Sequence, residues 1–122
     1  MYVEGPISDF LDKLASKSPE PGGGAASALA AAIGAALVSM VANLTVGKEK
    51  YADVQDDIHE LLYRSEQVRS RLQELVQKDT EAYAVLARAF KMPRETAAEK
   101  EERAEAVQAA LKEATMVPYA IA

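Results

Sequence analysis

The most distinctive hydrophobic pattern in the chain is an apolar run from Ala25 to Val46 that contains neither a charge nor a proline. Its alanine and leucine content favours helix, and its length is far beyond that of a strand. The run follows Pro21-Gly22-Gly23-Gly24, where glycines let the backbone turn freely. Gly47 stands where a C-terminal glycine cap belongs, and Lys48 follows it. The pattern predicts one long helix over 24–46 with marked ends.

Small residues form two rows along this helix, so neighbouring helices can approach it closely. The rows are Ala28, Ala32 and Ala36, and Ser27, Ala31, Ala35 and Ser39. A helix that is apolar all round is buried in a large core or in a membrane. The uncharged run exceeds ~18 residues, which makes it formally a transmembrane candidate. However, it is rich in alanine rather than leucine and no aromatic belt flanks it. We therefore expect a central helix surrounded by other helices, and no membrane.

A second pattern, with apolar residues at alternating steps of three and four, runs from Tyr51 to Leu86. Its positions are Tyr51, Val54, Ile58, Leu61, Ser65, Val68, Leu72, Leu75, Asp79, Ala82 and Leu86. This heptad spacing predicts a helix over 50–90. So long a helix needs long partners, which predicts an oligomer. Ser65 can bond back to its own helix, but a carboxylate on an apolar face, as at Asp79, must be paired, exposed at an edge, or functional.

Two further helices complete the pattern. An N-terminal one over 6–17 would bury Phe10 and its apolar neighbours, with Pro6 in its first turn. A last one over 94–118 follows the capping-box sequence Thr96-Ala-Ala-Glu99, and Pro118 is expected to kink or end it. No strand pattern alternates anywhere. The sequence therefore predicts a single all-α domain over 1–122, a long-helix bundle around the alanine-rich helix.

Composition narrows the function. The chain has 122 residues, a net charge of −5 and no cysteine. An acidic chain argues against a nucleic-acid binder that neutralises phosphates, and the lack of thiols excludes disulfides and thiolate metal sites. One histidine, His59, makes neither a metal cluster nor a triad. The first ten residues lack a signal-peptide pattern, so we expect a cytoplasmic location.

The candidate chemistry lies in the glycine triplet, two lysines and one acid. Unpaired N–H groups at Gly22–Gly24 would suit an anion, although glycines could equally just permit a tight helix entry. Lys48 and Lys50 could steer an anionic ligand or merely compensate the helix dipole. Asp79 is either an acid–base group or a structural carboxylate paired with a basic residue or a helix N-terminus.

The segment from Pro19 to Tyr51, PEPGGGAASALAAAIGAALVSMVANLTVGKEKY, resembles the cyclodeaminase/cyclohydrolase family of folate enzymes. This family includes the cyclodeaminase domain of formimidoyltransferase-cyclodeaminase and bacterial methenyltetrahydrofolate cyclohydrolases. The likeness continues, in the same order, through Lys78-Asp-Thr-Glu-Ala-Tyr83, Lys91-Met-Pro93, Arg103 and Ala114-Thr-Met-Val-Pro118. The family is all-helical and typically dimeric. Its domain is longer, by helices that follow Pro118 and that this sequence lacks, so the chain is expected to be a piece of a domain or one half of a split protein.

The resemblance implies a function. The enzyme would convert formimidoyltetrahydrofolate to methenyltetrahydrofolate and ammonia, or hydrolyse methenyltetrahydrofolate, with no metal or redox cofactor. Asp79 would be the catalytic acid–base group that also stabilises the methenyl cation. Gly22, Gly23, Gly24, Ser27 and Lys48 would bind the folate. The expected partners are a folate substrate and a second copy of the chain. The alternatives are a non-catalytic helical assembly module that retains the fold, and a membrane-inserted hairpin.

Overall fold

The computed structural model describes residues 4–121, with side chains through Met116. In that part of the chain every regular element is a helix: α1 (Ile7–Ala15), α2 (Gly23–Thr45), the 3₁₀ segment η2 (Glu49–Val54), α3 (Gln55–Phe90) and α4 (Ala97–Ile121). The predicted all-α class is confirmed. The capping box is confirmed in part, because the Glu99 backbone N–H donates to Thr96 Oγ1 at 3.1 Å.

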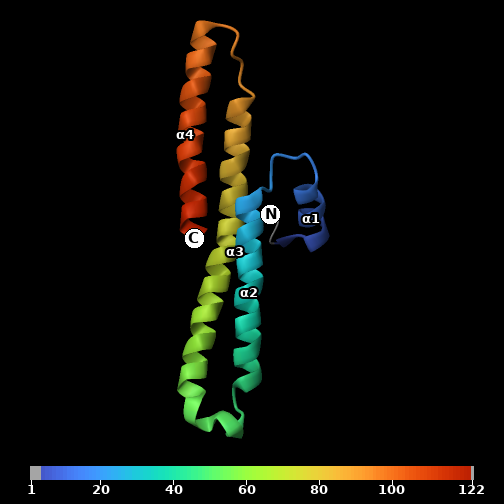
Figure 1. The fold of residues 1–122 in the computed structure, drawn as a ribbon, viewed down its shortest axis with the longest axis vertical. Helices are drawn as coiled ribbons and strands as arrows, with labels where there is room; N and C mark the ends of the chain where they lie inside the picture. The colour runs from blue at the N-terminus through green and yellow to red at the C-terminus, as the bar shows by residue number, and fades with distance from the viewer. Residues whose placement is uncertain (1–3, 122) are drawn as a thin grey trace.

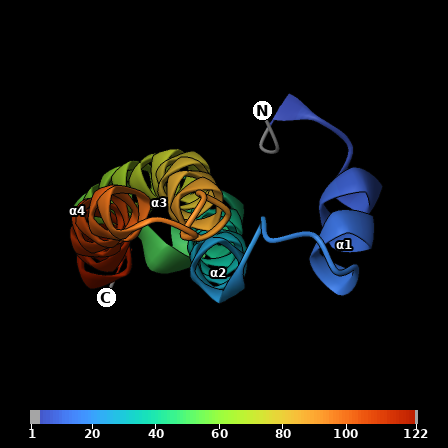
Figure 2. The same ribbon diagram turned by 90° about the horizontal axis from the view of Figure 1, so that it is seen from above.

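The long helix α3 is the spine of the molecule (Figure 1). Helix α2 runs antiparallel to its N-terminal half, and α4 runs antiparallel to its C-terminal half. The N-terminal end of α2 and the C-terminal end of α4 therefore both reach the middle of α3, while α1 lies to the other side of α2 (Figures 1 and 2). At this meeting point, helix ends from distant parts of the sequence lie close together.

The core is small and divided. One cluster joins α1, α2 and α3, and a second joins α3 to α4 through Leu86, Ala89 and Ala110. The first cluster contains Phe10, Ala25, Ala28, Ala32, Leu72, Leu75 and Val76. Alanines on the α2 side let the two backbones approach closely, so the larger side chains of α3 fill the seam.

Helix α2 is buried on one face only, which corrects the expectation of a helix surrounded by others. The face toward α3 is buried and consists of Ala25, Ala28, Ala32, Ala35, Ser39 and Ala42. The opposite face is apolar but exposed, with Ile33, Leu37, Met40, Val41 and Leu44 each at least half exposed. Ala36, from one of the predicted small-residue rows, is exposed as well. A single neighbouring helix, α3, covers only part of the circumference of α2, and Ile33 on the open face lines a hollow together with Ile7 and Phe10 of α1.

The heptad stripe of α3 is buried in its C-terminal part, where Leu72, Asp79 and Leu86 lie, and exposed at Leu61 and Val68. Two helices flank α3 near its middle, but its N-terminal half has α2 alone. The predicted start of this helix is also corrected. Residues 49–54 form a 3₁₀ turn with a non-helical Tyr51, because the chain must reverse there after α2. Helix α4 continues through Pro118 to Ile121 rather than ending at the proline.

Helix α2 is long and apolar enough to cross a membrane by length and hydropathy, with a third of its most apolar window buried. Its neighbour α3 carries charges over the same length. Arg64 pairs with Glu60 at 2.8 Å, and Arg69 with Glu66 at 2.7 Å. Placing α2 in a bilayer would take these charges of α3 into it too, at high cost. The packing favours a core helix over a membrane span.

Candidate functional site

The glycine turn and the seam acid, widely separated in sequence, are in direct contact. A Cβ added to Gly24 would lie 2.7 Å from Asp79 Cγ, so the carboxylate occupies the space that a side chain would need. The backbone N–H of Ala25 also hydrogen-bonds this carboxylate. Gly22, the N-cap of α2, has no side chain that could cap the helix. Asp79 of α3 therefore supplies the acceptor that a capping side chain would normally provide.

Burial sets the acidity of this group. Asp79 is only 6% exposed. Loss of hydration raises the pKa of its carboxyl above the ordinary value of 3.8, and the hydrogen bond from Ala25 opposes that rise without cancelling it. A carboxyl with a raised pKa holds and releases a proton closer to neutral pH than a free aspartate does. Asp79 was interpreted as either a structural carboxylate at a helix N-terminus or an acid–base group. The structure shows the contact with the N-terminus of α2, and the raised pKa of the same carboxyl suits it to acid–base chemistry.

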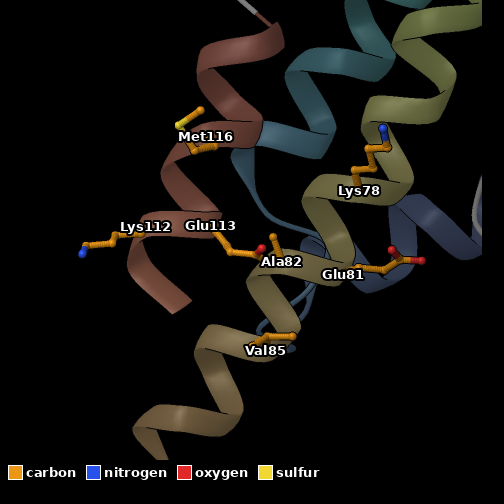
Figure 3. A pocket seen from close by; sticks show the side chains of 7 residues that line it. All are labelled: Lys78, Glu81, Ala82, Val85, Lys112, Glu113 and Met116. Atoms are coloured by element: carbon orange, nitrogen blue, oxygen red, sulfur yellow. The ribbon is translucent and has the colours of Figure 1, made fainter. Parts of the chain in front are cut away.

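A hollow of about 540 Å³ opens between α3 and α4, and Lys78 and Glu81, near Asp79 in the sequence, line it, whereas Asp79 itself does not. Figure 3 shows its residues, with Ala82 and Val85 on α3 and Met116 on the facing turn of α4. Glu113 points across toward Ala82, whereas the ends of Lys112 and Glu81 point away. The hollow thus combines an apolar floor with charged groups at its rim, and its size would hold part of a small organic ligand.

A second hollow, of about 460 Å³, lies on the opposite side of α3 between α1 and the segment before the glycine turn. Gln77 and Thr80, which flank Asp79 in sequence, line it together with Glu20. Gln77 Oε1 is buried and accepts no hydrogen bond, while the amide nitrogen of the same residue donates to Glu81. Sequence neighbours of Asp79 thus line the two hollows, whereas its own carboxylate faces the N-terminal end of α2 and lines neither.

Of the other site residues predicted from the sequence, the structure brings only some close to Asp79. Gly22 and Gly23 adjoin the Asp79 contact, and Ser27 is exposed one turn further along α2. Lys48 lies beyond the other end of α2, ~35 Å away at 1.5 Å per residue. Within one chain, Lys48 cannot reach a ligand held at the glycine turn. His59 is exposed near the start of α3, also far from the turn.

Sequence reasoning missed a polar network between α2 and α3. Ser39 Oγ lies 2.7 Å from Ser65 Oγ and donates to Glu66 Oε2 at 2.9 Å. Arg69 holds the same carboxylate with two hydrogen bonds of 2.7 Å. Hydrogen bonds from Arg69 and then Ser39 lower the pKa of Glu66 from 4.5 to about 2. The sequence feature that could have indicated this network is Ser39, a polar residue on the same face of the apolar run as Ala32 and Ala35.

Among residues 4–121, no three histidine or carboxylate side chains gather as a metal ion would require. The groups with chemical potential at the centre of the molecule are thus the Asp79 carboxylate, the N–H groups of the glycine turn, and the polar atoms lining the two hollows. Together they can accept a proton, return it, and stabilise a cation next to a carboxylate.

Comparison with known proteins gives one consistent result. Residues 6–122 match the family model described as formiminotransferase-cyclodeaminase. The methenyltetrahydrofolate cyclohydrolase of Methylorubrum extorquens is 49% identical over 114 residues, covering 93% of this chain and 55% of that protein. The formimidoyltransferase-cyclodeaminase of Sus scrofa is 34% identical over 96% of this chain and 22% of its own length. The crystal structure of formiminotetrahydrofolate cyclodeaminase from Thermotoga maritima superposes with a TM-score of 0.79 at 33% identity, over 99% of this chain and 56% of that one.

Proposed function

The chain belongs to the formiminotransferase-cyclodeaminase family, and on that premise we propose that it acts in folate one-carbon chemistry. The proposed reaction is hydrolysis of methenyltetrahydrofolate, or formation of that compound from formimidoyltetrahydrofolate with release of ammonia. The chain spans about half the length of the relatives named for the single activities, and less than a quarter of the bifunctional one. The higher identity to the cyclohydrolase favours hydrolysis as the first activity to test.

The observation that supports this proposal best is the position of Asp79. Its carboxylate is buried and held by the N-terminal end of α2, and its sequence neighbours Lys78 and Thr80 each line one of the two hollows. In hydrolysis, water adds to the methenyl carbon and loses a proton, and the ring nitrogen whose bond to that carbon breaks gains one. In deamination, the anilino nitrogen attacks the formimidoyl carbon, and the departing amine must be protonated. Asp79 would move the proton in either direction.

The same carboxylate would stabilise the substrate. The methenyl compound is a delocalised cation, and a buried carboxylate nearby stabilises such a charge more strongly than one in water does. Neither reaction changes the oxidation state of carbon, so a redox cofactor is not needed. We propose that no metal takes part either. We further propose that the protein is a cytoplasmic homodimer that binds neither nucleic acid nor membrane. The net charge of −5 argues against nucleic acid, and the charged residues of α3 beside α2 argue against a membrane.

The test follows methenyltetrahydrofolate by its absorbance, which should fall during hydrolysis and rise when formimidoyltetrahydrofolate is supplied instead. Asp79→Asn keeps the shape and the hydrogen-bond acceptor for Ala25 but cannot carry the proton. We expect it to reduce turnover by at least ~10²-fold while leaving the fold nearly intact. The matched control is Asp57→Asn, an exposed acid in the first turn of α3.

Two outcomes would overturn the proposal. If Asp79→Asn turns over at the wild-type rate but unfolds more easily, Asp79 is a structural cap and the site lies elsewhere. If the wild-type protein neither converts nor binds either folate, the chain is the non-catalytic assembly module.

A further inference from the structure

Two hollows adjoin each other on the side of the bundle that α1 faces. Helix α1 stands apart from α2 and α3 in the view from above (Figure 2). The hollow of about 460 Å³ described above lies beside α1, and so does another of about 230 Å³. Gly5 lines both, so the two hollows meet there, and we call them together the α1 trough. One stripe of α3 lines the trough from end to end and covers ~16 Å at 1.5 Å per residue: Arg69, Gln73, Val76, Gln77 and Thr80. The α1 trough is therefore elongated and suits an extended ligand.

The end of the α1 trough nearest the glycine turn is rich in hydrogen-bond acceptors. Asp9 and Glu20 contribute carboxylates, and Lys13 pairs with Glu20 at 2.9 Å, so the lining side chains carry one negative charge in excess. Gln77 adds a carbonyl oxygen that accepts no hydrogen bond from the described residues. Because its amide nitrogen donates to Glu81 at 3.0 Å, the orientation of the amide is fixed. This end favours a ligand group that carries N–H donors or a positive charge.

The middle of the α1 trough is apolar. Phe10 of α1, Ile33 of α2 and Val76 of α3 line the smaller hollow from three helices. Phe10 is only 3% exposed, and Val76 is fully buried. Ala32 and Ala36 line the same hollow with small side chains, which leaves room that larger residues would fill. An apolar hollow of this kind accepts an aromatic ring and disfavours a charged group.

The far end of the α1 trough presents hydrogen-bond donors. Among the described residues, Glu66 binds the Arg69 guanidinium through its Nε and Nη2 atoms, at 2.7 Å each. These bonds fix the guanidinium and leave Nη1 as the nitrogen that a ligand would meet. Gln73, one turn further along the same face of α3, brings an amide group to this end. Donors in this arrangement favour a carboxylate.

The three parts of the α1 trough follow the order of the groups in a folate. A folate carries N–H donors on its pterin ring, an aminobenzoyl ring in the middle, and glutamate carboxylates at the far end. We propose that the α1 trough is the folate-binding groove of this chain, an inference that rests on the proposed function. The pterin ring lies against Glu20 and Gln77, and the aminobenzoyl ring lies between Phe10 and Ile33. The glutamate lies at Arg69.

This orientation also places the reacting carbon. The methenyl carbon joins the pterin ring to the aminobenzoyl nitrogen, so it lies where the two hollows meet, level with Val76 and Gln77 of α3. Asp79 is on the next part of the same turn, with its carboxylate directed at the adjoining N-terminal end of α2. The negative charge in excess at the acceptor-rich end stabilises the methenyl cation at this point.

A pair of ligands tests the arginine end. 5-Formyltetrahydrofolate is a stable probe, and 5-formyltetrahydropteroate differs from it only by lacking the glutamate. In calorimetric titrations, Arg69→Met should weaken binding of the folate probe by ~10-fold or more and leave binding of the pteroate probe unchanged. Gln73→Leu, at the same end, should show the same selectivity and serves if Arg69→Met loses helix content. Arg64→Met is the matched control, an exposed arginine that pairs with Glu60 at 2.8 Å outside the trough, and should change neither affinity.

The same two probes test the pterin end. Gln77→Leu keeps the approximate shape of the side chain and removes the acceptor. It should weaken binding of both probes to the same extent, by ~5-fold or more, because both carry the pterin ring. Gln67→Leu is the matched control, an exposed glutamine on α3 outside the trough, and should bind both probes as the wild type does. Circular dichroism checks that each variant keeps its helix content.

The outcomes separate this inference from the proposed function. If the arginine-end variants weaken both probes equally, or weaken neither, the glutamate does not lie at Arg69 and the inference is wrong. Turnover of methenyltetrahydrofolate by the same wild-type protein would then leave the proposed function standing, with the substrate bound elsewhere. A wild type that binds neither probe also overturns the inference. The expected pattern of affinities without any change in methenyl absorbance would instead support the groove and contradict the proposed activity.

Discussion

At the scale of single residues, the three glycines before α2 have different roles. A Cβ at Gly23 would meet nothing within 4 Å, whereas one at Gly24 would collide with the Asp79 carboxylate. Gly24→Ala should therefore lower the free energy of unfolding by ~1–3 kcal/mol, because the carboxylate must leave the end of α2. Gly23→Ala should raise it by ~0.4–1 kcal/mol through reduced freedom of the unfolded chain. Urea denaturation measures both, and equal effects would show that Asp79 does not lie over Gly24.

The raised pKa of Asp79 predicts how stability changes with pH. The folded state binds this proton more tightly than the unfolded chain, whose value is near 3.8. The contribution of Asp79 is therefore most favourable below 3.8 and is lost as the pH rises through the folded pKa. The Asp79→Asn variant does not lose stability in this way. The difference between its free energy of unfolding and that of the wild type should therefore increase with pH and then level off. Glu66, with its pKa lowered to about 2, is present in both proteins and cancels from the comparison. A difference that is constant across pH would contradict the raised pKa.

At the scale of elements, α2 has a tight face and an open face. Ala32 is 5% exposed and packs against the α3 side chains of the first core cluster, while Ala36, one turn later, is exposed. Ala32→Leu should destabilise the fold by ~1–3 kcal/mol through overpacking. Ala36→Leu, beside a hollow of about 230 Å³ at the junction with α1, should be tolerated. The unfolding midpoints of the two variants check this, and similar shifts would mean that α3 packs elsewhere on α2.

At the scale of the whole molecule, α3 positions the site. It is ~54 Å long at 1.5 Å per residue, and α2 and α4 each cover one half of it. The ends of these two helices meet near Asp79, so the candidate site lies where the bundle changes from one pair of helices to the other.

The sequence by itself determined the helices and the family. Uninterrupted three- and four-residue spacing, a glycine at each end of α2 and the capping box at Thr96 are local signals, and local signals decide where a helix begins and ends. They also singled out Asp79, because a carboxylate on an apolar stripe violates the pattern around it. The comparisons confirmed the family from the same residues.

Only the tertiary structure decided which groups meet. It placed Asp79 on Gly24, left Lys48 at the far end of α2, and connected Ser39 to Glu66 and Arg69. It also showed that one face of α2 is open, although the sequence is apolar on every side of that helix. Contacts between helices depend on rotation and register, which an alanine-rich helix with apolar residues all round leaves undetermined. The single face that α3 covers follows from the packing of α3 side chains against small residues, and no local pattern contains that information.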